Sequence, residues 1–219
     1  MSAAVTVPRQ SRKRARTRGE LVAAAERLVA LRGLDALSID EITEEADVAK
    51  GTFYTHFQDK DDLANAISRQ IRADLEEAIE ALNLGLRDPT VRMANGLSTI
   101  LHFAITQPVR ARALLRLLPG AVNPDTPIND GIRGDILAGI EGGAFHVASV
   151  SASVVATIGI VMSAGMRLSD AGQPVGQPHR FARDIITTAL VALGVKPAAA
   201  ERLSAAAIEA RRVDVSLAP

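Results

Sequence analysis

Six side chains that can donate or accept hydrogen bonds lie close together in the first third of the chain. They are Lys50, Thr52, Tyr54, Thr55, His56 and Lys60, with Gly51 among them. Hydroxyl, ammonium and imidazole groups are the types that read base edges in the major groove of DNA and bind the phosphates beside it. Gly51 has no side chain, so the backbone there can approach a partner closely. Residue types of this kind suit a nucleic-acid partner if one exposed helix presents them.

The rest of the chain lacks the patterns of catalytic and metal sites. It contains no cysteine, which excludes disulfides, thiolate metal sites and a cysteine nucleophile. Its four histidines are scattered, and no nucleophile elbow, phosphate-binding glycine loop or histidine–acid metal cluster occurs. We therefore expect no enzyme, no metal and no cofactor. An enzyme with a helical body is one alternative, which a metal or cofactor in the purified protein would favour.

The charges are balanced in number but unevenly distributed. The chain has 25 basic and 25 acidic residues, yet residues 1–18 carry six basic side chains and no acidic one. We expect residues 1–14 to form a basic, flexible arm. A solvated tail and an arm that contacts phosphates or the minor groove are both open. The segment lacks the apolar region of a secretory signal, and together with the absence of cysteine this indicates a cytoplasmic protein.

Residues 147–166 form an uncharged run that is long enough to span a bilayer. The run contains four serines, one threonine and two glycines, which make membrane insertion marginal. We interpret it as a buried helix of a soluble bundle and expect no membrane partner. A membrane-associated protein is the second alternative, and fractionation of cells would test it.

Apolar periodicity predicts an all-α protein. Apolar residues at spacings of three and four predict a first helix over residues 16–32, and Gly33 is placed for a left-handed C-cap. Ser38 and Glu41 predict a capping box at the start of a short second helix. A third short helix covers residues 49–57. The later helices are expected at 59–82, 90–107, 109–118, 131–146, 147–169, 179–194 and 198–211.

Two short helices joined by a few residues, 38–45 and 49–57, have the spacing of a helix-turn-helix. The residue types are more specific than the spacing. The positions that carry the pattern are Gly33-Leu34-Asp35-Ala36-Leu37-Ser38-Ile39, Ile42, Ala46, Val48, Gly51, Tyr54, His56-Phe57, Lys60 and Leu63. From about Ala15 to Arg72 the chain resembles, without a gap, the DNA-binding domain of the TetR/AcrR family of helix-turn-helix transcriptional regulators.

Most of this motif is expected to be scaffold. The predicted core residues of the small domain are Ile39, Ile42, Ala46, Val48, Phe53, Phe57 and Leu63. Four side chains are then left to face the groove: Lys50, Thr52, Thr55 and His56. For His56, base, phosphate and structural roles are all open. The resemblance assigns Tyr54 and Lys60 to phosphates, and Thr43 could act in the same way from the second helix. The complete expected DNA-binding set is Arg16, Ser38, Thr43, Ala49, Lys50, Gly51, Thr52, Tyr54, Thr55, His56 and Lys60.

Two positions depart from the family pattern. Asp47 stands in the turn where the family commonly has glycine, and aspartate tolerates a left-handed backbone better than most residues. Ala49 stands where a capping serine or threonine is common, and the lost cap costs about 1 kcal/mol. Both changes suggest weaker DNA binding, or binding that depends more on the basic arm.

The resemblance implies that residues 15–75 form the DNA-binding domain, with its motif at 38–57. It also implies that residues 76–219 form a larger helical domain for ligand binding and dimerisation, joined to the first by a long helix. A dimer fits because two recognition helices must reach successive major grooves. The implied interface is the helix pair 147–169 and 179–194. Burial of both helices within one subunit would explain their apolar faces equally well. The small residues expected at the interface are Ala148, Ala152, Ala156, Ser163 and Ala164, and the apolar ones are Phe181, Ile185, Ile186, Ala189, Leu190 and Leu193.

The middle helices of such proteins usually enclose a pocket for an effector. The candidate lining residues here are Leu101, His102, Phe103, Leu114, Leu117, Phe145, His146 and Val150. Apolar walls with a few polar groups suit a small, largely apolar ligand. The sequence thus predicts a homodimeric repressor that such a ligand releases from a near-palindromic operator in double-stranded DNA. An activator, or a regulator that needs no ligand, is an alternative within the same fold.

Overall fold

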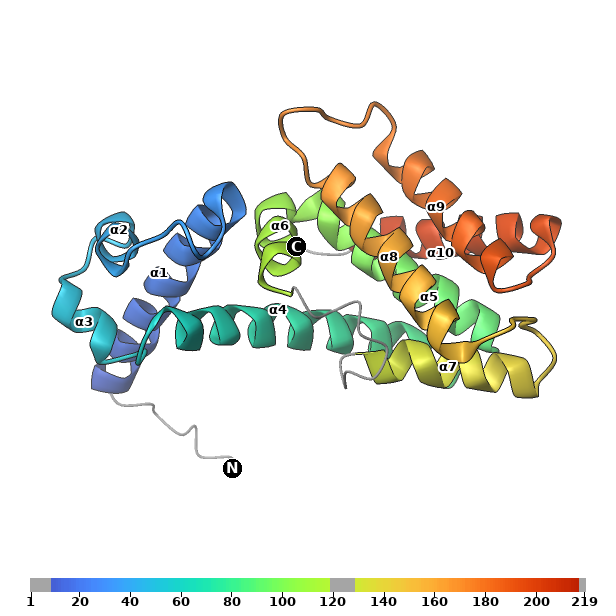
Figure 1. The fold of residues 1–219 in the computed structure, drawn as a ribbon, viewed down its shortest axis with the longest axis horizontal. Coiled ribbons are helices and arrows are strands. Elements are labelled where there is room, and N and C mark those ends of the chain that lie inside the picture. Colours follow the sequence, from blue (N-terminus) through green and yellow to red (C-terminus); the bar gives the residue numbers. More distant parts are fainter. Residues whose placement is uncertain (1–8, 119–128, 217–219) are drawn as a thin grey trace.

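A computed structural model describes residues 9–118 and 129–216, and within these ranges the chain forms helices without a strand. In order they are α1 (Arg9–Arg32), α2 (Ile39–Glu45), α3 (Lys50–Tyr54), α4 (Lys60–Asn83), α5 (Pro89–Thr106), α6 (Pro108–Leu117), α7 (Asp130–Glu141), α8 (Val150–Leu168), α9 (Pro178–Ala192) and α10 (Pro197–Ser216). The predicted all-α fold is confirmed. Helices α1 to α3 gather at one end of the molecule, and the long α4 runs from them beneath the larger body (Figure 1).

The local signals in the sequence produce the helix ends that they predict. The Ser38 hydroxyl accepts a hydrogen bond from the Glu41 backbone N–H at 3.2 Å, and the Glu41 carboxylate accepts one from the Ser38 N–H at 2.8 Å. Asp59 caps α4 by accepting from the Asp62 N–H at 2.8 Å. Gly33, with φ of +80°, ends α1 in the left-handed conformation that glycine adopts without strain.

Two apolar cores lie side by side along the molecule. One lies under α1 to α3 and the first half of α4, where Ile42, Phe53 and Leu63 are fully buried. This core also takes in residues from the end of α5 and from α6, namely Phe103, Ala104, Ala111, Ala113 and Leu114. The other core lies among α5, α7, α8, α9 and α10. The end of the molecule formed by α1 to α3 therefore shares its core with α6.

Five helix boundaries differ by three residues or more from those expected. α3 ends at Tyr54 and not at residue 57, and α10 continues past residue 211 to Ser216. α1 begins at Arg9, so residues 9–14, which we assigned to a flexible arm, are helical; residues 1–8 of that arm lie outside the described residues. α7 stops at Glu141 because two glycines follow, the second with φ of +70°. α8 starts at Val150 after its Ser149 cap. Residues 142–149, expected to be helical, form instead a loop that turns the Phe145 ring back against α7.

α8 is long and apolar enough to cross a membrane by length and composition alone. It packs instead as a partly buried core helix, with Val154, Ile158 and Val161 in the larger core. The interpretation of residues 147–166 as a helix of a soluble protein is in agreement with this packing.

Candidate nucleic-acid interface

The turn between α2 and α3 sets the angle at which α3 is presented. Asp47 has φ of +52°, and among the described residues no other non-glycine residue has a positive φ. The backbone N–H groups of Asp47 and Val48 donate to the carbonyls of Glu44 and Thr43 at 3.1 and 3.0 Å. The predicted left-handed aspartate is confirmed, and the turn is closed by backbone hydrogen bonds despite the missing glycine.

α3 is a short helix anchored by one aromatic ring. Phe53 is fully buried, whereas Lys50, Gly51, Tyr54 and Thr55 are exposed. Thr52 is half-buried. Ala49 precedes the helix with an extended backbone and makes no side-chain cap, as its residue type predicts. One face of this segment is thus fixed in the core, and the opposite face presents hydrogen-bonding groups to solvent.

Lys50, at the start of α3, is paired with an acid of α2. Its ammonium lies 2.8 Å from one carboxylate oxygen of Asp40 and 3.0 Å from the other. The hydrogen bond with Asp40 and the charge of this carboxylate raise the pKa of Lys50. Both side chains are exposed, so the pair can open at little cost when another acceptor offers a stronger partner.

The two residues assigned to phosphates by resemblance differ in their freedom. Tyr54 is 55% exposed, and its ring packs edge-on against Phe53 with 5.5 Å between centroids. The ammonium of Lys60 donates to the carbonyls of Leu37 at 2.5 Å and Leu34 at 3.4 Å. Through these hydrogen bonds Lys60 links the start of α4 to the loop before α2. An ammonium has three N–H groups, so this arrangement leaves one for a phosphate.

Four other members of the expected set make contacts within the domain, among them Thr55, whose hydroxyl donates to the Thr52 carbonyl at 2.7 Å and keeps only its lone pairs for a partner. Thr43 is buried, and its hydroxyl donates to carbonyls of its own helix at 3.0 and 3.1 Å, which does not fit a phosphate contact. The Ser38 hydroxyl belongs to the capping box, bonded to Glu41. Arg16 is exposed and pairs with Glu20 at 3.5 Å.

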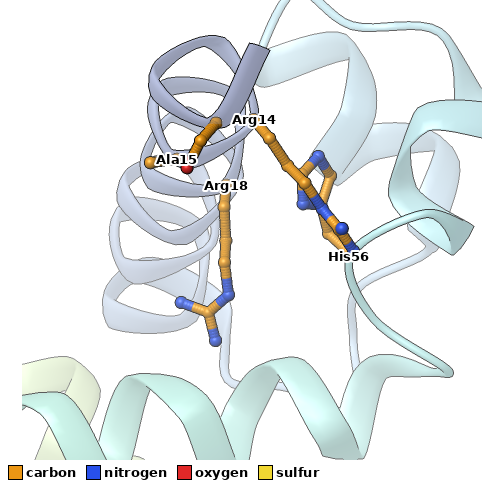
Figure 2. A pocket seen from close by; sticks show the side chains of 5 residues that line it. Arg14, Ala15, Arg18 and His56 are labelled. Carbon is orange, nitrogen blue, oxygen red and sulfur yellow. The ribbon is translucent and has the colours of Figure 1, made fainter. Parts of the chain in front are cut away.

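A basic hollow between α1 and the end of α3 is the feature that sequence analysis did not identify. It has a volume of about 340 Å³ and is lined by Ser11, Arg14, Ala15, Arg18 and His56. In Figure 2 the Arg14 side chain extends alongside His56 while Arg18 descends beside it. The α1 residues of this set are three, four and seven positions apart, which places them on one face of a helix. That spacing was visible in the sequence, but their meeting with His56 depends on the packing of α1 against α3.

α6 connects the end formed by α1 to α3 to the rest of the molecule through charged contacts. The Arg110 guanidinium lies 2.7 Å from Asp74 on α4 and 3.5 Å from Glu26 on α1. Arg116 donates to the Val29 carbonyl in the last turns of α1 at 3.3 Å. Burial raises the pKa of the Glu26 carboxyl, an effect that the nearby Arg110 opposes. Helix α6 thus holds both α1 and α4.

The same helix also reaches the end of α8. Arg112 donates to the Ser169 carbonyl at 2.9 Å and to the Asp170 carboxylate at 3.1 Å. The pKa of Asp170 is lowered by the Gly172 backbone N–H and by Arg112. A displacement of α6 would therefore also move α1, α4 and the segment after α8, or break their contacts with α6.

The residues expected to line an effector pocket do not form one group. They divide between the two cores: Leu101, Phe145 and Val150 pack in or against the larger core, and Phe103, Leu114 and Leu117 in or against the smaller. The basic hollow lies away from them, and so does a second hollow, which is lined by Arg183, Asp184, Thr187 and Glu201. A ligand that contacts fully buried side chains such as Leu101 has to displace their neighbours.

The two histidines of that expected set lie in different surroundings. His102 on α5 is half-buried and stacks on His179 of α9, with 6.1 Å between ring centroids. This pair joins residues far apart in the sequence, so no local pattern could have revealed it. His146 is exposed, and its backbone N–H donates to the Leu193 carbonyl at 2.9 Å.

The surfaces of α8 and α9 partly revise the expected dimer interface. On α8 the small residues Ala152, Ala156 and Ser163 are exposed, whereas Ala164 is buried. The apolar face expected on α9 points inward: Ile186, Ala189, Leu190 and Leu193 are buried in the larger core, and Phe181 and Ile185 pack against it. For α9, burial within one subunit therefore explains these residues, and its exposed face is a different one.

Comparison with known proteins gives matches in both sequence and fold. The family described as "Bacterial regulatory proteins, tetR family" matches residues 21–67, the stretch that holds α2, α3 and the turn between them. No curated protein matches the chain.

Solved structures match over most of the chain. A structure of RolR in complex with resorcinol is 26% identical with a TM-score of 0.54, and the match covers 89% of this chain and 95% of that one. An ArpA-like γ-butyrolactone receptor is 20% identical with a TM-score of 0.69, covering 90% and 98%. CprB from S. coelicolor A3(2), described as a TetR family protein, is 22% identical with a TM-score of 0.68, covering 90% and 98%.

Proposed function

Because the chain belongs to the TetR family of DNA-binding transcriptional regulators, we propose that it is a homodimeric repressor, released from a near-palindromic operator by a small, largely apolar ligand. The observation that carries the proposal is the exposed face of α3. Lys50, Gly51, Tyr54 and Thr55 are presented together by a helix whose opposite side is anchored by Phe53. Hydrogen-bonding groups held in this way suit the major groove, where donor and acceptor patterns distinguish the base pairs.

Within this proposal the contacts divide between specificity and positioning. Thr52, Thr55 and Lys50 face base edges, Lys50 after its separation from Asp40. Tyr54 and the remaining N–H of Lys60 bind phosphates, which hold the protein in register without reading sequence. Residues 15–75 form the DNA-binding domain and residues 76–219 the regulatory domain, with α6 packed across the boundary.

The dimer brings two copies of α3 to successive major grooves. We assign its interface to the exposed small residues of α8, such as Ala152 and Ala156, which permit close approach of helices. α8 packs against α9, and each carries an exposed apolar residue: Met166 is 50% exposed on α8 and Val191 is 40% exposed on α9. Ala156→Glu should convert the dimer to a monomer in light scattering, and Ala73→Glu, on the exposed side of α4, should leave the dimer intact.

The ligand acts by binding the regulatory domain, residues 76–219. A ligand releases DNA only if it binds the non-binding conformation more tightly. RolR was crystallised with resorcinol, and a second match is a γ-butyrolactone receptor; both names indicate small molecules with a compact ring and few polar groups. A ligand of this class inserted near Leu101 and His102 would push on α5 and α6, and α6 holds both α1 and α4.

DNA binding is tested first by fluorescence anisotropy, with duplexes recovered by selection from random sequence. Wild-type protein should bind the selected duplex in the presence of competitor DNA and with a steep salt dependence. Tyr54→Phe keeps the ring packed on Phe53 and removes only the hydroxyl, so it should weaken binding without altering thermal stability. The regulator function is refuted if selection enriches no sequence and competitor DNA abolishes binding.

The ligand is tested on the same complex. Resorcinol, related phenols and γ-butyrolactones should be screened for an increase in melting temperature, and each positive compound should then be added to the protein–DNA complex. Release of DNA by a stabilising compound is the expected result. If every compound that stabilises the protein leaves the complex intact, the ligand-released mechanism is wrong.

A further inference from the structure

The hollow between α1 and the end of α3 contains positive charge that the protein does not neutralise. Several cations on α1 to α3 have an acidic partner: Arg16 with Glu20, Arg27 with Glu45, Arg32 with Glu41 and Lys50 with Asp40. Arg14 and Arg18 have none among the described residues. Two unneutralised guanidinium groups that line one hollow form a site for an anion.

Both arginines are nevertheless held in place. Arg14 donates to the Thr55 carbonyl at 3.3 Å, at the end of α3. The Arg18 guanidinium lies 4.8 Å from the centroid of the Phe57 ring. These contacts orient the two groups without cancelling their charges. A guanidinium has five N–H donors, so each keeps several for an incoming ligand.

His56 completes the lining, and its pKa lies below the ordinary value for histidine. Burial lowers its pKa, and the charges of Arg14 and Arg18 lower it further. These two side chains are the charged groups that act on it from α1; on its own segment the neighbouring ring is Phe57, at 6.5 Å between centroids. These surroundings disfavour the charged imidazole because protonation would place a third positive charge beside the other two.

A phosphate bound in the hollow would instead favour the protonated form of His56. Its negative charge offsets the two guanidinium groups, and its oxygens accept hydrogen bonds from them and from a protonated imidazole. The hollow lies beside Thr55, directly after the exposed face of α3, where the DNA backbone that borders the groove would pass.

We propose that a backbone phosphate of the bound DNA enters this hollow and that His56 takes up a proton as it does, so that DNA binding strengthens as the pH falls. The proposal rests on the proposed DNA-binding function and adds a regulation to it. By linkage, a ligand that binds the protonated form more tightly gains affinity at low pH. Each unit by which the phosphate raises the pKa of His56 corresponds to about tenfold stronger binding per subunit at a pH below both pKa values, compared with a pH above both.

The first test measures the proton directly. The four histidines of the chain give separate Cε1–H signals in NMR spectra, and His56→Gln identifies the signal of His56 by its loss. A pH titration is recorded for the free protein and for its complex with the selected duplex. We expect the pKa of His56 to be higher in the complex. An unchanged or lower pKa in the complex overturns the proposal even though DNA is bound.

The second test measures affinity. Anisotropy titrations between about pH 5.5 and pH 8 at constant ionic strength compare wild type, His56→Gln and the control His179→Gln, which removes a histidine of the body. Wild type and the control should bind about tenfold more tightly per subunit at the acid end. His56→Gln should lose this dependence. If His56→Gln keeps the full pH dependence, the inference is wrong while the DNA-binding function stands. If the wild type binds no duplex specifically at any pH, both fail.

Discussion

Arg110 makes the contacts on which the attachment of α6 to the DNA-binding end depends, and its replacement by methionine separates charge from packing. The methionine keeps a long apolar stem but leaves Glu26, which is only 9% exposed, without its cation. Loss of one partner from a fully buried ion pair costs about 3–5 kcal/mol. Here the Arg110–Glu26 distance is 3.5 Å and Asp74 lies near solvent, so we expect Arg110→Met to lower the free energy of unfolding by about 2 kcal/mol.

The loss of unfolding free energy caused by Arg110→Met should depend on pH in a defined direction. Burial raises the pKa of Glu26 above its usual 4.5, and Arg110 opposes the rise. A carboxyl with a raised pKa contributes stability that is present below its unfolded-state pKa and is lost as the pH rises through the folded-state value. Without Arg110 the folded-state pKa rises further, so more stability is lost at neutral pH. Arg110→Met should therefore be most destabilising near neutral pH and least so near pH 4.5.

Urea unfolding at both pH values provides the measurement, with Glu26→Gln as the matched partner variant. Glu26→Gln alone should change stability little, because Arg110 keeps Asp74. In the double variant the amide removes the buried charge, so about half of the loss should be recovered. Equal destabilisation at both pH values, together with no recovery in the double variant, would show that Arg110 acts through packing and that the electrostatic reasoning is wrong.

Three further predictions concern the α2–α3 region. Asp40→Asn frees Lys50 for DNA, so anisotropy should show about two- to fivefold tighter binding; unchanged affinity would mean that the ion pair does not compete with DNA. Ala49→Ser supplies the cap that the extended backbone before α3 can accept, and urea unfolding should show a gain of about 1 kcal/mol, with no gain contradicting the cap assignment. Ser38→Ala should cost about 1 kcal/mol. Hydrogen bonds from Ser38 and from Arg32 hold the pKa of Glu41 at about 2 instead of 4.5. Because this pKa is lowered in the folded state, the ionised carboxylate stabilises the fold above pH 4.5, and this stabilisation is lost as the pH falls towards 2. Unfolding curves across that interval should therefore be flatter for Ser38→Ala than for wild type, and identical slopes would contradict the capping box.

The sequence by itself was sufficient wherever a structure depends on near neighbours. The capping box needs only Ser38 and Glu41, three residues apart, and the left-handed turn needs a residue that tolerates positive φ, which Asp47 does. Apolar spacing placed the helices for the same reason, because the period of a helix is a local property. The helix-turn-helix, and with it the family, followed from such short-range signals.

The partners of individual side chains were decided only by the tertiary structure. Thr43 is polar, but the packing of α2 buries it, and the apolar face of α9 turned into its own subunit because α5 and α10 cover it. The charge available to DNA also depends on contacts between distant residues. Lys50 is paired with Asp40. Arg14 and His56 line the same hollow although 41 residues separate them in the sequence. Composition fixes how many charges a chain has; only the packing of its helices determines which of them are neutralised.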